Sequence, residues 1–276
     1  MAGGRHPTVL GMKLTDTHCH LTDGRLSGRL EEVLARAEAA GVVAAVCAAG
    51  SIADSAAAAA LAERYEQVFW MAGVHPHQAK DAGGDYLHQL ERLAGRAGNV
   101  AIGETGLDYH YDFSPPQVQR RVFAEQLELA KRLDKPVVIH TRQALDDTLA
   151  IVAEVRPPGR RLVFHSFTGG PDEVARVLET GCYVSFSGIA TFKKSGDVRA
   201  AAALVPDDRI LIETDAPYLS PEPVRKMKIN EPANVLHVLR CLAAARNAAA
   251  EALAESTTSN AVRFFALDTS VRDALS

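Results

Sequence analysis

The sequence predicts a single (β/α)8 TIM barrel with additional helices at its C-terminal end. Eight short apolar runs alternate with longer amphipathic stretches in one uninterrupted series along the 276 residues. A length of about 250 residues is typical of this fold. Several of the runs are nearly continuous in Val, Ile, Leu and Phe, which is typical of parallel strands covered on both faces. An open, doubly wound sheet is the alternative, but no glycine-rich dinucleotide-binding motif follows the first strand.

The expected strands are these eight apolar runs. They cover residues 13–21, 42–48, 68–74, 100–103, 136–140, 161–165, 182–186 and 209–213. The fifth run reads Pro-Val-Val-Ile-His and the eighth reads Arg-Ile-Leu-Ile-Glu. In both, an apolar strand ends on a side chain that can bind a proton or a metal ion.

The expected helices follow the strands. They lie near residues 30–40, up to 65, 86–93, 116–133, 144–155, 172–178 and 198–204, with two more near 233–245 and 249–266. The first has apolar residues at helical spacing between 30 and 37, and Gly41 stands where a helix commonly ends. The longest begins at Pro116, which suits a helix start because its missing N–H would have been unpaired there.

The domain organisation is simple. Residues 1–12 are expected to form a flexible N-terminal leader, and residues 13–276 one barrel domain that includes the C-terminal helices. No linker is evident, and no internal repeat beyond the strand–helix period.

The composition excludes one class of nucleic-acid-binding protein. The chain has 30 Lys and Arg against 34 Asp and Glu, a formal net charge of −4. A protein that coats nucleic acid needs an electropositive face, which this composition does not favour. Action on a single phosphate group stays open if metal ions supply the positive charge locally.

The sequence also predicts a cytoplasmic protein with no membrane contact and no obligate protein partner. The four cysteines are scattered without a CxxC pair, which is typical of reduced thiols. The N-terminal segment is too short and broken for a signal peptide. The most apolar stretch, residues 41–62, is interrupted by Ser51, Asp54 and Ser55, so it does not make a membrane span.

Histidines and carboxylates interrupt the apolar runs at one end only. They are His18 and His20 in the first run, Glu104 after the fourth, His140 and His165 at the ends of the fifth and sixth, and Asp215 after the eighth. The C-terminal ends of barrel strands converge on one mouth. Side chains two apart on a strand share a side, so His18 and His20 can bind one ion while Cys19 points away.

Imidazole and carboxylate ligands suit Zn²⁺, Mn²⁺ or Mg²⁺. Six ligands are more than one tetrahedral ion needs, and they fit two divalent ions bridged by a carboxylate. Asp16 is expected behind these ligands, where it would orient an imidazole through its other nitrogen.

Seven motifs in this order resemble those of the TatD-family metal-dependent DNases. They are Asp-Thr-His-Cys-His-Leu at 16–21, Gly-Val-His-Pro-His at 73–77, Gly-Glu-Thr-Gly-Leu-Asp-Tyr at 103–109, Pro-Val-Val-Ile-His-Thr-Arg at 136–142, His-Ser-Phe-Thr-Gly at 165–169, Glu-Thr-Asp-Ala-Pro-Tyr at 213–218 and Asn-Glu-Pro-Ala-Asn at 230–234. Any one of them alone is weak, because HxH occurs in many metallohydrolases, but the ordered series is specific.

The resemblance implies roles for these residues. His18 and His20 would hold one metal together with Asp215, His140 and His165 would hold the second, and Glu104 would bridge the two. His75 would contact the scissile phosphate, and His77 is a weaker candidate for such a contact.

Further roles are expected around this set. Asp215 is also a candidate base for the attacking water. Glu213, two residues earlier on the same side of the strand, is expected behind the ligands. Arg142 and the cluster of Arg225, Lys226 and Lys228 are candidate phosphate contacts. The family commonly has a basic residue where this chain has Ile229, and commonly Cys where it has Ser166.

The resemblance and the six-ligand set together predict a hydrolase of DNA phosphodiester bonds. We expect a 3′–5′ exonuclease that uses two divalent ions and prefers single-stranded or frayed ends. One alternative is a barrel hydrolase of amides, lactones or other phosphoesters. Many of those bridge their metals with a carboxylated lysine on strand 4, where this chain has Glu104. A second alternative is a non-catalytic metal-binding scaffold.

Overall fold

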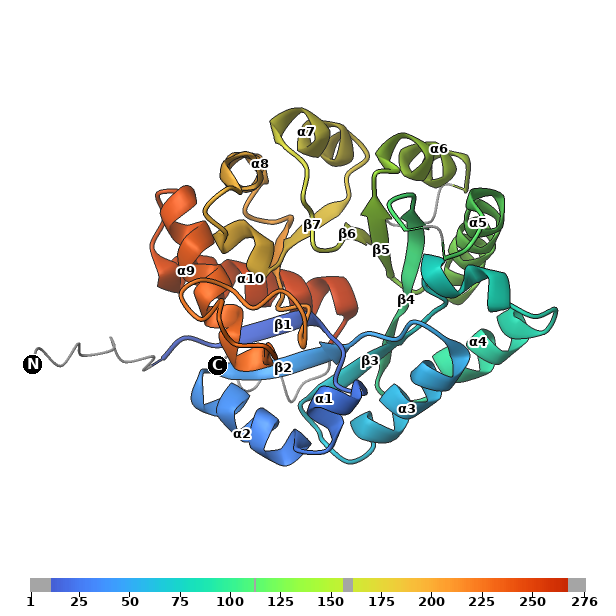
Figure 1. The fold of residues 1–276 in the computed structure, drawn as a ribbon, viewed down its shortest axis with the longest axis horizontal. Helices are drawn as coiled ribbons and strands as arrows, with labels where there is room; N and C mark the ends of the chain where they lie inside the picture. Colours follow the sequence, from blue (N-terminus) through green and yellow to red (C-terminus); the bar gives the residue numbers. More distant parts are fainter. Residues whose placement is uncertain (1–10, 112, 156–160, 268–276) are drawn as a thin grey trace, which may run out of the picture.

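The computed structural model describes residues 11–111, 113–155 and 161–267, and it confirms the predicted barrel (Figure 1). Eight parallel strands pair in the order in which they follow one another in the sequence. They are β1 (Leu14–Cys19), β2 (Val42–Cys47), β3 (Val68–Ala72), β4 (Asn99–Asp108), β5 (Val137–Arg142), β6 (Leu162–Phe164), β7 (Tyr183–Phe186) and β8 (Ile210–Ile212).

The helices surround this barrel. They are α1 (Gly24–Ser27), α2 (Leu30–Ala39), α3 (Ile52–Ala62), α4 (Tyr86–Ala94), α5 (Pro116–Leu133), α6 (Leu145–Val155), α7 (Pro171–Glu179), α8 (Gly196–Leu204), α9 (Val235–Ala245) and α10 (Ala250–Phe265). Short 3₁₀ helices lie in the loops after β3, β7 and β8, namely η1 (Pro76–Asp81), η3 (Gly188–Thr191) and η4 (Pro232–Asn234). These 3₁₀ helices and α1 are absent from the sequence-based expectation, because their apolar periodicity is too short to detect.

The barrel is closed by contacts between β1 and the segment after β8. Cys19 and Ala216 form a parallel bridge, and the amide of His20 donates to the carbonyl of Ala216. The amide of Asp215 donates to the carbonyl of His18 at 2.9 Å. These bonds exclude the doubly wound open sheet.

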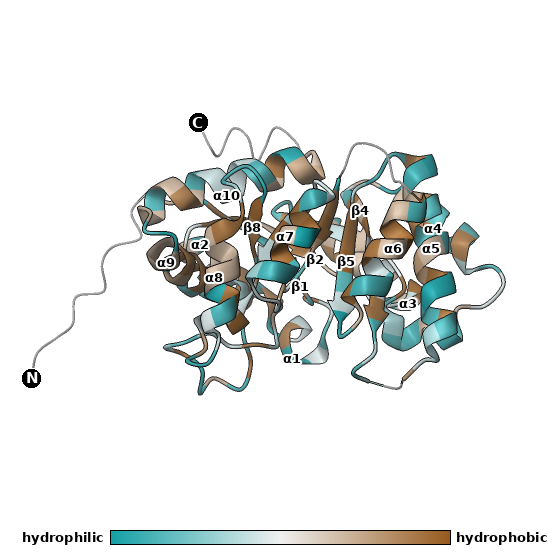
Figure 2. Ribbon diagram, turned by 90° about the horizontal axis from the view of Figure 1, so that it is seen from above, coloured by the Kyte–Doolittle hydropathy of each residue, from teal (hydrophilic) through white to brown (hydrophobic). Residues whose placement is uncertain are grey.

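Two apolar layers support the barrel. Outward-facing strand residues pack against the helices, and Figure 2 shows hydrophobic strands enclosed by helices whose outer faces are hydrophilic. A second cluster joins alternate strand residues such as Val46, Met71 and Leu211 with Phe264 and Phe265 of α10. The last helix therefore packs against side chains of the barrel interior.

Polar contacts show which end of the barrel α10 covers. The Thr258 hydroxyl donates to the carbonyl of Lys13, just before β1, at 2.8 Å. The Asn260 amide donates to the carbonyls of Asp207 and Ile210, before and at the start of β8. Because these positions begin their strands, α10 closes the N-terminal end of the barrel and leaves the C-terminal mouth free for the site.

One strand differs from its expectation in a way that affects the site. β4 continues to Asp108 instead of ending before Glu104, so Glu104 lies inside the strand. The register of β4 against β5 shifts between Ile102 and Thr105. Because β4 contains glycines, the apolar pattern of the sequence did not reveal the second half of the strand. Gly106 has φ of +143°, and a Cβ there would lie 1.9 Å from the carbonyl oxygen of His140.

The ends of the chain are only partly described. Of the expected leader, residues 1–10 lie outside the described residues, as do residues 268–276 at the other end. Among the described helices, none combines the length and the apolar character needed to cross a membrane.

Candidate metal centre

The predicted ligands lie at the C-terminal mouth of the barrel, around a cavity of about 780 Å³. Six side chains meet there: His18, His20, Glu104, His140, His165 and Asp215. All but His18 line the cavity itself, and His18 is buried beside Glu104, with 3.3 Å between Nε2 and Oε2. The structure therefore brings the whole predicted set together.

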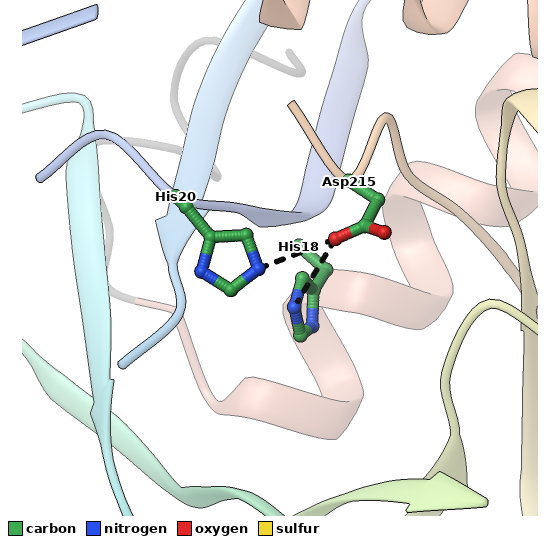
Figure 3. A group of neighbouring side chains, drawn as sticks. All are labelled: His18, His20 and Asp215. Carbon is green, nitrogen blue, oxygen red and sulfur yellow. Dashed lines mark ion pairs between the residues drawn. The ribbon is translucent and has the colours of Figure 1, made fainter. Parts of the chain in front are cut away.

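His18, His20 and Asp215 form the first group (Figure 3). The Oδ1 atom of Asp215 lies 3.2 Å from Nε2 of His20 and 3.8 Å from Nε2 of His18. Asp215 has a left-handed φ of +56°, and its amide is fixed on the carbonyl of His18. Between the two histidines, the Cys19 thiol faces away toward the carbonyl of Val46, as the strand alternation predicts.

Glu104 lies between the two sets of histidines and is only 3% exposed. Its Oε2 faces His18, while its Oε1 is 2.9 Å from Nε2 of His165 and 3.0 Å from Nδ1 of His140. Oε1 is also 3.3 Å from Nε2 of His75. A carboxylate with one oxygen toward each set has the arrangement of a bridging ligand.

Two buried carboxylates orient the second set of histidines. Glu213 accepts from Nδ1 of His165 at 3.1 Å, and Asp108 accepts from Nε2 of His140 at 3.1 Å. Each histidine therefore donates one N–H to a carboxylate and directs its other nitrogen, Nε2 of His165 and Nδ1 of His140, at Glu104. This carboxylate–histidine pairing is the usual support of a metal-binding imidazole.

The donor set fits a divalent cation. Imidazole nitrogens and carboxylate oxygens are ligands that Zn²⁺ and Mn²⁺ prefer, and here Nε2 of His165 and Nδ1 of His140 converge on the same oxygen of Glu104. In addition, neither ring nitrogen of buried His18 has a hydrogen-bond partner within the described part of the chain. Buried polar atoms are normally satisfied, so these atoms also indicate an ion-binding site.

Burial and charge act against each other in this cluster. Burial opposes ionisation of Glu104, but the neighbouring histidines, led by His165, outweigh it and hold the pKa of the carboxyl well below its usual range. The pKa of Asp215 is lowered in the same way, since contact with His20 outweighs its burial. Both side chains are therefore ionised at neutral pH.

His75 differs from the other histidines of the site. Its Nδ1 accepts a hydrogen bond from the amide of His77 at 3.1 Å, so the neutral ring carries its proton on Nε2, which faces Glu104. Burial lowers the pKa of His75 to about 4, so the ring is neutral at neutral pH. A ring in this form presents an N–H on its cavity side, beside Oε1 of Glu104, and has no free lone pair there.

Asp108 is a residue that the sequence reasoning missed. Its Oδ2 accepts from His140 and also from Nε2 of His77 at 2.9 Å, and these bonds outweigh its burial and lower its pKa. A signal was present, because Glu104, Gly106 and Asp108 alternate and therefore share one side of a strand. Because the fourth strand was expected to end before Glu104, this alternation was not recognised.

Asp16 does not have the contact expected of it. Its carboxylate accepts from the amide of His18 at 3.4 Å and from the amide and hydroxyl of Thr214 at 2.9 and 2.6 Å. Asp16 therefore fixes the backbone of β1 and of the segment after β8, where the barrel closes. It does not hydrogen-bond to the ring of His18. The sequence spacing predicted that Asp16 and His18 lie close together, but it could not show that the Asp16 side chain turns toward the segment after β8.

Only some of the expected phosphate contacts reach the cavity. His75, His77 and Arg142 line it. Arg225 packs its guanidinium over the ring of Phe192, 3.3 Å from the centroid, and Lys226 and Lys228 are exposed on the same loop, outside the cavity lining. Ile229 is partly buried and packs against the core.

A closed barrel with a histidine–carboxylate cluster at its C-terminal mouth defines the class of this protein, the TIM-barrel metal-dependent hydrolases. Comparison with known proteins gives the particular family. The family model described as TatD related DNase matches residues 15–266, so the chain belongs to the TatD DNase family.

Several relatives are similar over nearly their whole length. YcfH of Escherichia coli strain K12, an uncharacterized metal-dependent hydrolase, is 40% identical over 263 residues, which are 94% of this chain and 98% of YcfH. A protein of Cronobacter sakazakii named 3′-5′ ssDNA/RNA exonuclease TatD is 37% identical over 254 residues, covering 91% of this chain and 97% of that protein.

Solved structures agree with the fold. The crystal structure of YjjV, a TatD homologue from Escherichia coli, superposes with a TM-score of 0.87 at 31% identity, covering 92% of this chain and 98% of YjjV. A TatD-family hydrolase from Entamoeba histolytica gives a TM-score of 0.85 at 22% identity, covering 92% of this chain and 98% of that one, which supports the fold alone.

Proposed function

We propose that this protein is a metal-dependent deoxyribonuclease that removes nucleotides from the 3′ end of single-stranded or frayed DNA. The observation that carries the proposal is Glu104, whose two oxygens face two sets of histidines across one cavity. The substrate and the polarity are supported by relatives of 37% and 35% identity, each named as a 3′-5′ ssDNA/RNA exonuclease.

The proposed site holds two divalent ions, drawn from Zn²⁺, Mn²⁺ and Mg²⁺. His18, His20 and Asp215 would hold the first, His140 and His165 would hold the second, and Glu104 would be shared between them. Bound divalent ions supply positive charge at the phosphoryl oxygens and lower the pKa of a water molecule. This local charge offsets the formal net charge of −4 where the phosphate lies.

The side chains around the ions have separate tasks. The Nε2–H of His75 lies at the cavity wall beside Glu104, where it can donate to a phosphoryl oxygen and stabilise the charge that develops there. Asp215 is ionised and lines the cavity, so it accepts the proton of the attacking water. Glu213 and Asp108 act on the ligands, since they fix the ring orientation of His165 and His140.

A digestion assay tests this proposal. A single-stranded oligonucleotide labelled at its 5′ end should give a ladder that shortens with time, and a chelator should stop the reaction. Asp215→Asn should lower the rate by at least about 100-fold with the circular dichroism spectrum unchanged. The matched control is Asp172→Asn, an exposed carboxylate at the start of α7, which should retain the wild-type rate.

The same assay separates the alternatives. Turnover of a lactone or an amide with no release of nucleotides would replace the nuclease proposal with another barrel hydrolase. A protein that binds metal but turns over none of these substrates would be a scaffold.

The compartment is part of the proposal. All four cysteines are free thiols, and Cys19, Cys47 and Cys182 are buried. Free buried thiols suit a reducing environment, so we propose that the protein works in the cytoplasm. Fractionation of cells that express a tagged chain tests this assignment.

A further inference from the structure

An arginine and two aromatic side chains form a stack beside the cavity. The rings of Tyr111 and Phe113, in the segment after β4, are parallel within 13° and their centroids are 5.3 Å apart. The guanidinium carbon of Arg142, at the end of β5, lies 4.8 Å from the centroid of the Tyr111 ring. We call Arg142, Tyr111 and Phe113 the rim stack, because Tyr111 and Arg142 line the cavity.

The rim stack is unusually open to solvent. Tyr111 is 40% exposed and Phe113 is 52% exposed, whereas large aromatic side chains are generally well buried. In the described part of the chain only three other large apolar side chains are this exposed: Leu204, Tyr218 and Met227. Two adjacent exposed rings beside a catalytic cavity therefore indicate a surface that is covered when a ligand binds.

The rim stack is also connected to the candidate ligand cluster. Asp108, which accepts from His140, accepts the amide of Tyr111 with its other oxygen at 3.1 Å. The ring of His77 lies edge-on to Phe113 at 4.8 Å. Aromatic side chains have only two rotatable torsions and lose little entropy on binding, so the rim stack suits recognition of a flat group near the reacting phosphate.

We propose that the rim stack binds an unpaired nucleobase of the substrate, next to the phosphate that is cleaved. This inference rests on the proposed nuclease function and adds a subsite to it. The exposed ring of Phe113, at the end of the stack, offers a face for the base, and the Arg142 guanidinium at the other end offers a positive charge for the neighbouring phosphate. Base–aromatic stacking of this kind tolerates any sequence.

The rim stack explains a preference for single strands by physical means. A base inside a duplex is already stacked on both faces and paired at its edge, so it reaches the stack only after the end of the duplex frays. The base stacks without sequence readout, and the metal cluster acts on the backbone.

The experiment combines a protein change with a substrate change. Phe113→Leu keeps an apolar side chain but removes the aromatic face. On a single-stranded oligonucleotide it should lower kcat/KM by about 10- to 100-fold, mainly through KM. The same variant is then assayed on oligonucleotides whose terminal or penultimate 3′ nucleotide lacks a base. When the missing base is the one that contacts the rim stack, the loss of kcat/KM caused by Phe113→Leu should be at least about fivefold smaller than on intact DNA. Phe113→Trp, which keeps an aromatic face, should have the wild-type KM on intact DNA.

A matched control is present at the other end of the barrel. Arg64 lies over the ring of Tyr65 just before β3, 5.2 Å from the centroid, so it repeats the arginine–tyrosine contact away from the cavity. Tyr65→Leu should leave KM unchanged on every substrate. Thermal unfolding of both variants checks that each is folded.

Two results would overturn the proposed nucleobase subsite, and both can be distinguished from failure of the nuclease proposal. Equal losses for Phe113→Leu on intact and base-free substrates would mean that Phe113 only supports His77. If the wild type releases no nucleotides, the nuclease proposal fails, and fluorescence anisotropy then decides the subsite. Equal binding of intact and base-free oligonucleotides by the wild type would exclude it.

Discussion

At the scale of single residues, the hydrogen bonds of each imidazole distinguish the candidate metal ligands from the candidate hydrogen-bond donor to the substrate. His140 and His165 each donate one N–H to a carboxylate and direct the other nitrogen at Glu104, where the proposed ion would bind, whereas His75 accepts at Nδ1. His75→Leu should therefore leave the metal content of the protein unchanged and lower kcat by about 100- to 1000-fold. Elemental analysis and single-turnover rates measure the two effects. Loss of an ion in this variant would make His75 a ligand, and His140→Leu serves as the comparison that should lose metal.

Asp108 gives a second prediction at this scale. Asp108→Asn removes the charge that holds the rings of His140 and His77, so metal affinity should fall about 10- to 100-fold. Competition with a fluorescent chelator measures this affinity directly. Glu66→Gln, an exposed carboxylate before β3, is the control. An unchanged affinity in Asp108→Asn would mean that the cluster itself orients His140.

The sequence predicted which residues come together in this site, but it predicted their individual hydrogen-bond and packing partners less well. The six candidate ligands are polar residues near the C-terminal ends of parallel strands, and strand geometry alone brings them to one mouth of the barrel. The turn of Asp16 away from the His18 ring depends on the seam between β1 and β8, which no local pattern contains. Arg225 is near the site in sequence, yet it packs over Phe192 instead.

At the scale of secondary structure elements, β4 is the part that the sequence predicted least well. The other strands are apolar runs bounded by polar residues, so their positions were evident. β4 continues through Gly103, Glu104 and Gly106, which are poor strand formers, and it holds its shape because β5 packs closely against it. Tertiary contact decided its length.

Gly106→Ala tests this close approach. The added Cβ would clash with the His140 carbonyl at a φ that side chains rarely adopt, so the free energy of unfolding should fall by about 3 kcal/mol. Denaturant titration measures the change. Gly196→Ala at the start of α8 meets no atom within 4 Å and should be neutral or slightly stabilising. Equal stability of the two variants would show that β4 and β5 separate without cost.

At the scale of the whole molecule, the proposed metal centre joins several strands of the barrel. Its candidate ligands come from β1, β4, β5 and the segments after β6 and β8, so ions that bind there only in the folded state would stabilise all of them. Mn²⁺ or Zn²⁺ at about 100 times its Kd should raise Tm by roughly 5 °C over chelator-treated protein. Differential scanning calorimetry checks this shift. An identical Tm in both conditions would contradict binding at the cluster, and Asp215→Asn should show a smaller gain.

The packing of α10 also sets an order for biosynthesis. This helix fills the N-terminal end of the barrel and bonds Thr258 to Lys13, across 245 positions of sequence. A chain emerging from the ribosome exposes β1 first, but the interior of the barrel stays open to water until α10 has followed. Folding of the barrel is therefore completed only after α10 has been synthesised, and until then the apolar faces of the early strands depend on other protection from aggregation.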